Sequence, residues 1–132
     1  MAERPTAGEL LEAVREFLEH DALPALEGRP AFHARVAINT IAIVERELAL
    51  GPANDAAEQA RLSTLLGHGG ELDSLRAEVS SAIRSGALDD RRAEVLDALR
   101  ASIRAALAVA NPKYLGPDPG PPHDPPTTKG TP

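Results

Sequence analysis

The chain has 132 residues, enough for one domain, and 42% of them are hydrophobic, which is sufficient for a single core. Aromatic residues make up only 2%, so we expect an aliphatic core rich in alanine, a composition that favours packed helices over sheets. The formal charge of -6 and the pI of about 5.2 disfavour binding to the phosphate backbone of nucleic acid, and the absence of cysteine excludes disulfides and thiolate chemistry.

The first predicted helix begins near Thr6. Thr6 and Glu9 have the spacing of a capping box, in which the hydroxyl accepts a hydrogen bond from one unpaired amide and the carboxylate reaches back to another. The apolar residues that follow repeat along one helical face: Leu10, Leu11, Val14, Phe17 and Leu18. Proline and glycine between 24 and 30 then interrupt the pattern, so segment 23–26 is expected to form only a turn of helix.

The second predicted helix spans 31–50 and is apolar on several sides, which is typical of a central helix with several neighbours. Gly51 followed by Pro52 is a common stop after a helix, so we expect the chain to break there. A third helix, capped by Asn54 or Asp55, should run to the residue before Gly67.

Two further helices follow, one over 72–85 that ends at Gly86, and one that starts at Asp89 or Asp90 and ends at Asn111. Short connections make neighbouring helices antiparallel. The sequence therefore predicts an all-α fold: an up-and-down helical bundle of four long helices plus a shorter fifth element, over residues 4–115.

The last part of the chain, residues 116–132, differs in composition. Eight of the twelve prolines lie in the final 21 residues, and such a segment buries too little to offset its ordering, so a disordered Pro/Gly-rich tail is expected. The first eleven residues are charged and lack an apolar run, and no stretch of about 18 apolar residues occurs. We therefore expect a cytoplasmic protein that does not associate with membranes.

Side chains that could carry catalysis are scattered. Glu16 and His20 lie four residues apart, but no second helix repeats the pair as a two-metal bundle would require. The run Gly67–Gly70 lacks the preceding strand and the following Lys-Ser/Thr of a phosphate loop. The serines fall in predicted helices and not on strained turns beside a base. We expect no metal, no cofactor and no catalytic residue.

One polar stripe stands out on the predicted central helix. Arg35, Asn39 and Arg46 fall on the same side of that helix, with the small Ala42 between them. Arginine offers a fork of donors that suits a carboxylate or a phosphate, so the stripe could hold a partner or an anion. Two alternatives stay open, because the stripe could be the solvated face of the helix, or Asn39 could be a buried polar residue that sets helix register.

Three strings carry a family resemblance: RPTAGELLEAVREFLE (residues 4–19), FHARVAINTIAIVEREL (residues 32–48) and NPKYL (residues 111–115). Over residues 4–115 the chain resembles a bacterial domain-of-unknown-function family of short helical proteins. Its members are typically encoded beside aminoglycoside-phosphotransferase-like kinases and acyl-CoA dehydrogenases. One member is similar to the small subunit of the levulinate-pathway kinase that phosphorylates 4-hydroxyacyl-CoA. The resemblance implies a role as a partner subunit and brings no catalytic motif with it.

The predicted function is therefore a non-catalytic accessory subunit that binds a phosphotransferase-like kinase acting on hydroxyacyl-CoA. We expect docking through the central helix and the corner that follows the last helix, with these polar contacts: Arg35, Asn39, Arg46, Asn111, Lys113 and Tyr114. A stand-alone homo-oligomeric bundle, in which a second copy covers the central helix, is one alternative. A bundle that binds an anionic small molecule through the arginine stripe is another.

Overall fold

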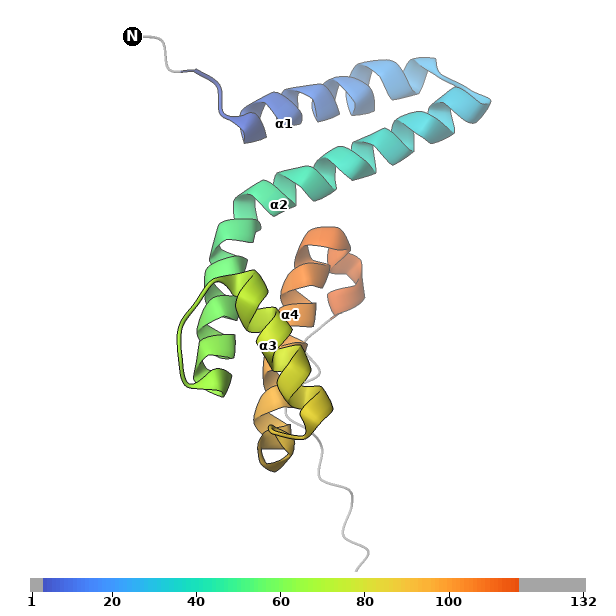
Figure 1. The fold of residues 1–132 in the computed structure, drawn as a ribbon. Coiled ribbons are helices and arrows are strands. Elements are labelled where there is room, and N and C mark those ends of the chain that lie inside the picture. The colour runs from blue at the N-terminus through green and yellow to red at the C-terminus, as the bar shows by residue number, and fades with distance from the viewer. Residues whose placement is uncertain (1–3, 117–132) are drawn as a thin grey trace, which may run out of the picture.

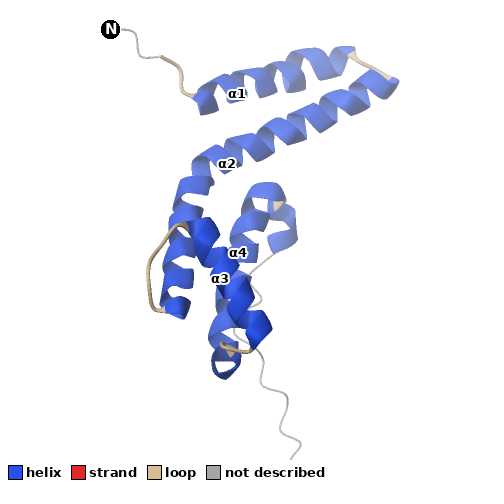
Figure 2. Cartoon of the chain, in the orientation of Figure 1, coloured by secondary structure: helices blue, strands red, loops and turns tan. Residues whose placement is uncertain are grey.

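The computed structural model describes residues 4–116, and within that range the chain forms helices and turns without any strand (Figures 1 and 2). The four α-helices are α1 (Ala7–Phe17), α2 (Gly28–Leu66), α3 (Leu72–Ser85) and α4 (Arg92–Ala110). Short helical turns lie at Leu18–Ala22, Leu23–Ala25, Asp89–Arg91 and, as η4, Pro112–Leu115. The predicted all-α fold is confirmed. The predicted disordered tail covers residues 116–132, and all of it except Gly116 lies outside the described range.

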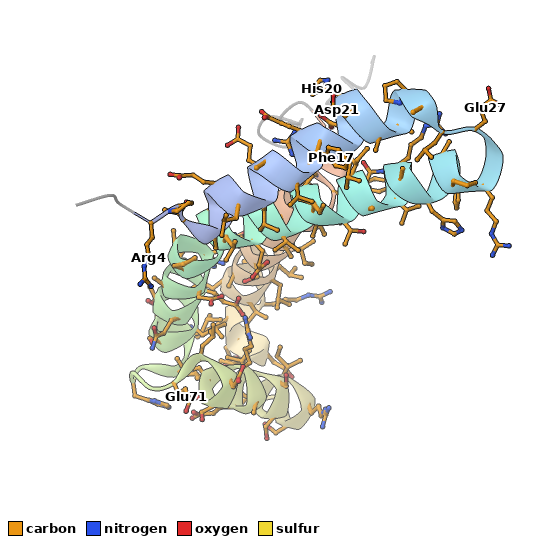
Figure 3. The ribbon with its side chains drawn as sticks, turned by 90° about the horizontal axis from the view of Figure 1, so that it is seen from above. Arg4, Phe17, His20, Asp21, Glu27 and Glu71 are labelled. Atoms are coloured by element: carbon orange, nitrogen blue, oxygen red, sulfur yellow. The ribbon has the colours of Figure 1, made fainter. Side chains whose placement is uncertain are left out.

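The long helix α2 organises the molecule. α1 runs back along the N-terminal half of α2, while α3 and α4 pack against its C-terminal half (Figure 1). Figure 3, seen from above, shows the same hairpin of α1 and α2 with Glu27 at the turn between them and Glu71 at the start of α3. The helices thus form two packed groups that share α2.

The predicted break at Gly51 and Pro52 is wrong, because α2 continues through both residues to Leu66. Proline has no N–H to donate to the carbonyl of Leu48, so the helix is expected to bend there, and the ribbon of α2 changes direction in its middle (Figure 1). Gly51 is buried and lines the same hollow as Ala105 and Ala106 of α4. The packing of α4 on this bend therefore outweighs the local preference to stop, and the second and third predicted helices are one.

Three other predicted helix ends are confirmed, whereas α2 begins at Gly28 and not at residue 31, and α4 begins at Arg92 without the predicted cap from Asp89 or Asp90. The Thr6 hydroxyl accepts a hydrogen bond from the amide of Glu9 at 3.1 Å, so it caps α1. Gly67 and Gly86 have φ angles of 78° and 82°, the left-handed conformation in which glycine commonly ends a helix. The predicted turn near residue 23 is the short Leu23–Ala25 element.

The main core lies where the C-terminal half of α2 meets α3 and α4. Its buried members are Leu62, Leu65, Leu75, Val79, Leu88, Val95 and Ala98. Leu75 is the one large side chain of the described range that is fully buried. By contrast, fifteen large apolar side chains within residues 4–116 are each more than a third exposed. A considerable part of the apolar surface within residues 4–116 is therefore left uncovered by the chain itself.

Candidate functional site

Both ends of α4 are tied to α2 by an arginine. Nη1 of Arg91 donates to the carbonyl of Leu65 at 2.6 Å, near the end of α2. Nε of Arg46 donates to the carbonyl of Val109 at 2.7 Å, near the end of α4. The last carbonyls of a helix have no partner within it and carry partial negative charge, so each guanidinium satisfies an acceptor and opposes the helix dipole.

This arrangement leaves a hollow of about 370 Å³ between the middle of α2 and the turn that ends α4. We call it the Asn39 groove. Its lining comes from two segments far apart in the chain: Asn39, Ala42, Ile43, Arg46, Ala110, Asn111, Pro112 and Lys113. α4 ends with the bond from the Asn111 amide to the carbonyl of Leu107, at 2.8 Å, and the turn that follows is closed by the bond from the Tyr114 amide to the carbonyl of Asn111, at 3.1 Å.

The structure brings together four of the six residues that the sequence predicted as contacts. Asn39, Arg46, Asn111 and Lys113 line the Asn39 groove. Arg35 is exposed one turn before Asn39, outside the lining of the groove. Tyr114 follows Lys113 in η4 and is 77% exposed. Because Asn39 is also exposed, the interpretation that it is a buried residue setting helix register is wrong.

Arg46 differs from the other predicted contacts. It is only partly exposed, and its Nε is used in the bond to Val109. Within residues 4–116, no ion pair joins Arg46 or Lys113 to a carboxylate. Arg46 therefore holds the C-terminal end of α4, which shapes the groove. Lys113 and the side-chain amides of Asn39 and Asn111 form the polar part of the groove's surface. Sequence reasoning missed this bond because its partners are 63 residues apart.

An apolar row adjoins the groove. Phe32, Val36 and Ile43 follow one side of α2 and are each more than a third exposed. We call these three side chains, together with Asn39, Lys113 and Tyr114, the α2–η4 surface. Sequence reasoning had interpreted this helix as a central one packed by several neighbours, and had named only its polar residues as contacts. The available signal was that a helix apolar on so many sides needs more neighbours than a chain of this length supplies.

Ion pairs between helices account for several of the perturbed charged groups elsewhere in the described range. Arg15 of α1 meets Glu45 of α2 at 2.7 Å, and Arg76 of α3 meets Glu58 of α2 at the same distance. The hydrogen bond from Arg76 lowers the pKa of Glu58. These shifts arise from contacts that hold helices together and do not gather around a cavity as the groups of an active site do.

The described residues hold neither a metal-binding cluster nor a membrane-spanning helix. Within residues 4–116, His, Asp and Glu side chains nowhere come together in a group of three or more that could hold a metal ion. None of the helices of that range is both long enough and apolar enough to cross a membrane.

Comparison with known proteins gives one match. A family model described as a domain of unknown function (DUF6285) matches residues 24–114, which is more than half of the chain, so the chain belongs to this family. The matched range contains α2, α3, α4 and the α2–η4 surface, and it leaves α1 outside. No curated protein and no solved structure matches the chain.

Proposed function

We propose that this chain, a member of the DUF6285 family, is a non-catalytic accessory subunit that acts by binding another protein. The observation that carries the proposal is the placement of the aromatic residues. The chain has only three aromatic residues, and all of them are exposed: Phe17 by 57%, Phe32 by 60% and Tyr114 by 77%. Aromatic side chains normally lie in the core, and those on a surface are enriched at the centre of protein interfaces.

The α2–η4 surface has the composition of such an interface. Phe32, Val36 and Ile43 offer apolar area along one side of α2, and Tyr114 adds an amphipathic ring from a second element. Asn39, between Val36 and Ile43, and Lys113 of η4 supply hydrogen-bond donors. Apolar and aromatic area combined with a few hydrogen-bond donors is usual in a protein interface. Because the bond from Arg46 of α2 to Val109 holds the end of α4, directly before η4, the surface is partly preorganised, which lowers the entropy cost of binding.

The partner that we propose is a cytoplasmic phosphotransferase-like kinase that acts on a hydroxyacyl-CoA in acyl-CoA catabolism. This identification rests on the sequence strings given above, and two of the three strings contribute to the α2–η4 surface: residues 32–48 and residues 111–115. In this arrangement the kinase supplies the nucleotide site and the catalytic base. The present chain supports the kinase or shapes its acyl-CoA pocket.

The test is co-expression with that kinase, affinity purification through a tag on one chain, and an ATP-consumption assay on a 4-hydroxyacyl-CoA. Phe32→Asp should abolish co-purification and lower activity to the level of the kinase alone. Leu48→Asp is the matched control, because Leu48 is similarly exposed but lies on a different side of α2. A kinase that is fully active, stable and soluble without this chain would overturn the proposal.

A second candidate function is suggested by the Asn39 groove alone. Its volume of about 370 Å³, with Arg46 and Lys113 in the lining, suits a small anion. The C-terminal end of α4 makes an anion site less favourable. Its last carbonyls carry partial negative charge, and one of them, that of Val109, already accepts a hydrogen bond from Arg46. An anion site would show itself as a thermal shift with acyl-CoA or inorganic phosphate in the absence of any kinase, and Lys113→Glu should remove that shift.

A further inference from the structure

A second surface, separate from the one proposed for the kinase, lies on α1. The helix packs on α2 through partly buried residues that include Leu11 and Leu18. Another side of the helix is left uncovered, with Leu10, Val14 and Phe17 between 49% and 57% exposed. Their spacing of four and three residues places them in one row, which we call the α1 stripe.

A groove of about 540 Å³ lies between α3 and α4. Its apolar lining includes Ile83, Leu96 and Leu99, all at least 40% exposed. Ile103, at 58% exposure, extends the row on α4 by one turn. We call this site, with Ile103, the α3–α4 groove.

Among the described residues, the unpaired charges around these two sites are mainly opposite in sign. α1 carries Glu9, Glu12 and Glu16. The α3–α4 groove is lined by Arg92 and by Asp89, and on the same two helices three further exposed arginines, Arg84, Arg100 and Arg104, outnumber Asp97, the acidic residue that is unpaired in the described part of these helices. Within residues 4–116, none of these three glutamates and four arginines takes part in an ion pair. Most of the other arginines of the range are bonded to a side chain or a carbonyl, so the arginines around this groove form a distinct group.

We propose that α1 of one copy of this chain docks into the α3–α4 groove of a second copy. The α1 stripe spans eight residues, and the row from Leu96 to Ile103 spans the same number, so each is about 10 Å long at the helical rise per residue. Apolar side chains then meet apolar side chains while the acidic helix lies among arginines. Two such contacts related by a two-fold axis form a closed dimer.

This pairing selects a second copy because both complementary halves are present on every molecule. An amphipathic helix that lays its apolar row into a groove is a common mode of recognition, and opposite charges at the rim favour the correct partner and register. The dimer covers the α1 stripe and the α3–α4 groove and leaves the α2–η4 surface open for the kinase. Dimerisation therefore goes beyond the proposed function, and neither depends on the other.

The test is the mass of the full chain, without any kinase, by sedimentation equilibrium over a range of concentrations. The wild type should be a dimer. Val14→Asp and Leu99→Asp, which place a charge in the α1 stripe and in the groove, should each weaken dimerisation at least about tenfold. Val36→Asp is the matched control, because Val36 is as exposed as Val14 but lies on the α2–η4 surface, so its variant should remain dimeric.

Mixing and charge exchange make the test specific. The Val14→Asp variant keeps an intact α3–α4 groove, and the Leu99→Asp variant keeps an intact α1 stripe. An equal mixture of the two variants should therefore form a heterodimer, held by the stripe of the second variant in the groove of the first. Glu9→Arg with Glu16→Arg should also weaken the dimer, and adding Arg92→Glu with Arg100→Glu to the same chain should restore it. The four charged positions are exposed, so their substitution should not disturb the fold. The charge-reversal variants therefore test the dimer contact even if an aspartate variant fails to fold. A monomeric wild type, or a dimer that survives both Val14→Asp and the glutamate reversal, would overturn the proposal.

Discussion

Arg46, in the middle of α2, donates from Nε to the carbonyl of Val109 at 2.7 Å and thereby fixes the C-terminal end of α4. Arg91 makes the equivalent bond at the other end of α4, to Leu65 of α2. Apolar packing alone is non-directional, so it does not set how far one helix slides along another. Two directional bonds at the two ends of α4 do set that position, and with it the register in which residues 111–113 face Asn39.

Removal of the Arg46 side-chain donors should loosen this end of the molecule. Arg46→Met keeps the aliphatic stem but leaves the Val109 carbonyl unpaired, so we expect a loss of about 1 to 2 kcal/mol in the free energy of unfolding. Amide exchange in residues 111–115 should be faster than in the wild type. Arg35→Met, at an exposed position of the same helix, should change stability by less than about 0.5 kcal/mol. Equal effects of the two substitutions would show that the bond does not hold α4.

Gly51, within α2, and Gly67, directly after its end, should respond to alanine in opposite directions. At Gly51 a new Cβ would lie 3.2 Å from Oε1 of Glu47, the far end of an exposed, flexible side chain, so the cost of contact is small. Gly51→Ala should therefore raise the free energy of unfolding by about 0.5 to 1 kcal/mol through helix propensity. Gly67→Ala should lower it by about 1 kcal/mol, because φ is 78° there. Urea denaturation measures both, and destabilisation by Gly51→Ala would show that Glu47 cannot move aside.

The attachment of α1 to α2 depends in part on Arg15 and Glu45. The guanidinium uses two nitrogens to reach both carboxylate oxygens, at 2.7 and 3.4 Å, and both side chains are about three-quarters buried. A double-mutant cycle with Arg15→Met and Glu45→Gln should give a coupling free energy of about 0.5 to 1 kcal/mol. A coupling near zero would show that apolar contacts alone hold α1.

The stability of the loop between α2 and α3 should depend on pH, because His68 in this loop titrates. Its ring nitrogens lie 2.8 Å from the carbonyl of Gly69 and 2.8 Å from Oε1 of Glu78, and both contacts raise the pKa of His68. Because the folded pKa is the higher one, the stabilisation is fully present below the ordinary histidine pKa of about 6.5 and is lost as pH rises through the folded value. An NMR titration should place the His68 pKa above that of a model histidine, and Glu78→Gln should lower it. A His68 pKa at or below the model value would contradict this account.

Most helix ends were predictable because their causes are local. The Thr6 cap and the left-handed glycines at Gly67 and Gly86 each act within a few residues of the end they determine. Gly51 and Pro52 carry the same local signal, yet α2 continues through them. The difference is tertiary, since burial of Gly51 against α4 depends on residues more than fifty positions away.

The candidate site was predictable residue by residue but not as a surface. Asn39 and Lys113 could each be singled out from the sequence, whereas their meeting in one groove depends on how α4 lies along α2. The exposure of Phe32 and Val36 could not be predicted either. An apolar residue on an amphipathic helix has the same pattern whether its neighbour belongs to the same chain or to a partner.

The central claim is that the α2–η4 surface binds a kinase, and the most direct measurement compares wild type, Phe32→Asp and Leu48→Asp in co-purification with the phosphotransferase-like kinase. The account predicts that wild type and Leu48→Asp co-purify and support ATP consumption on a 4-hydroxyacyl-CoA, and that Phe32→Asp, while still folded by circular dichroism, does neither. If Phe32→Asp binds as well as the wild type, or if the kinase is equally active alone, the claim is contradicted.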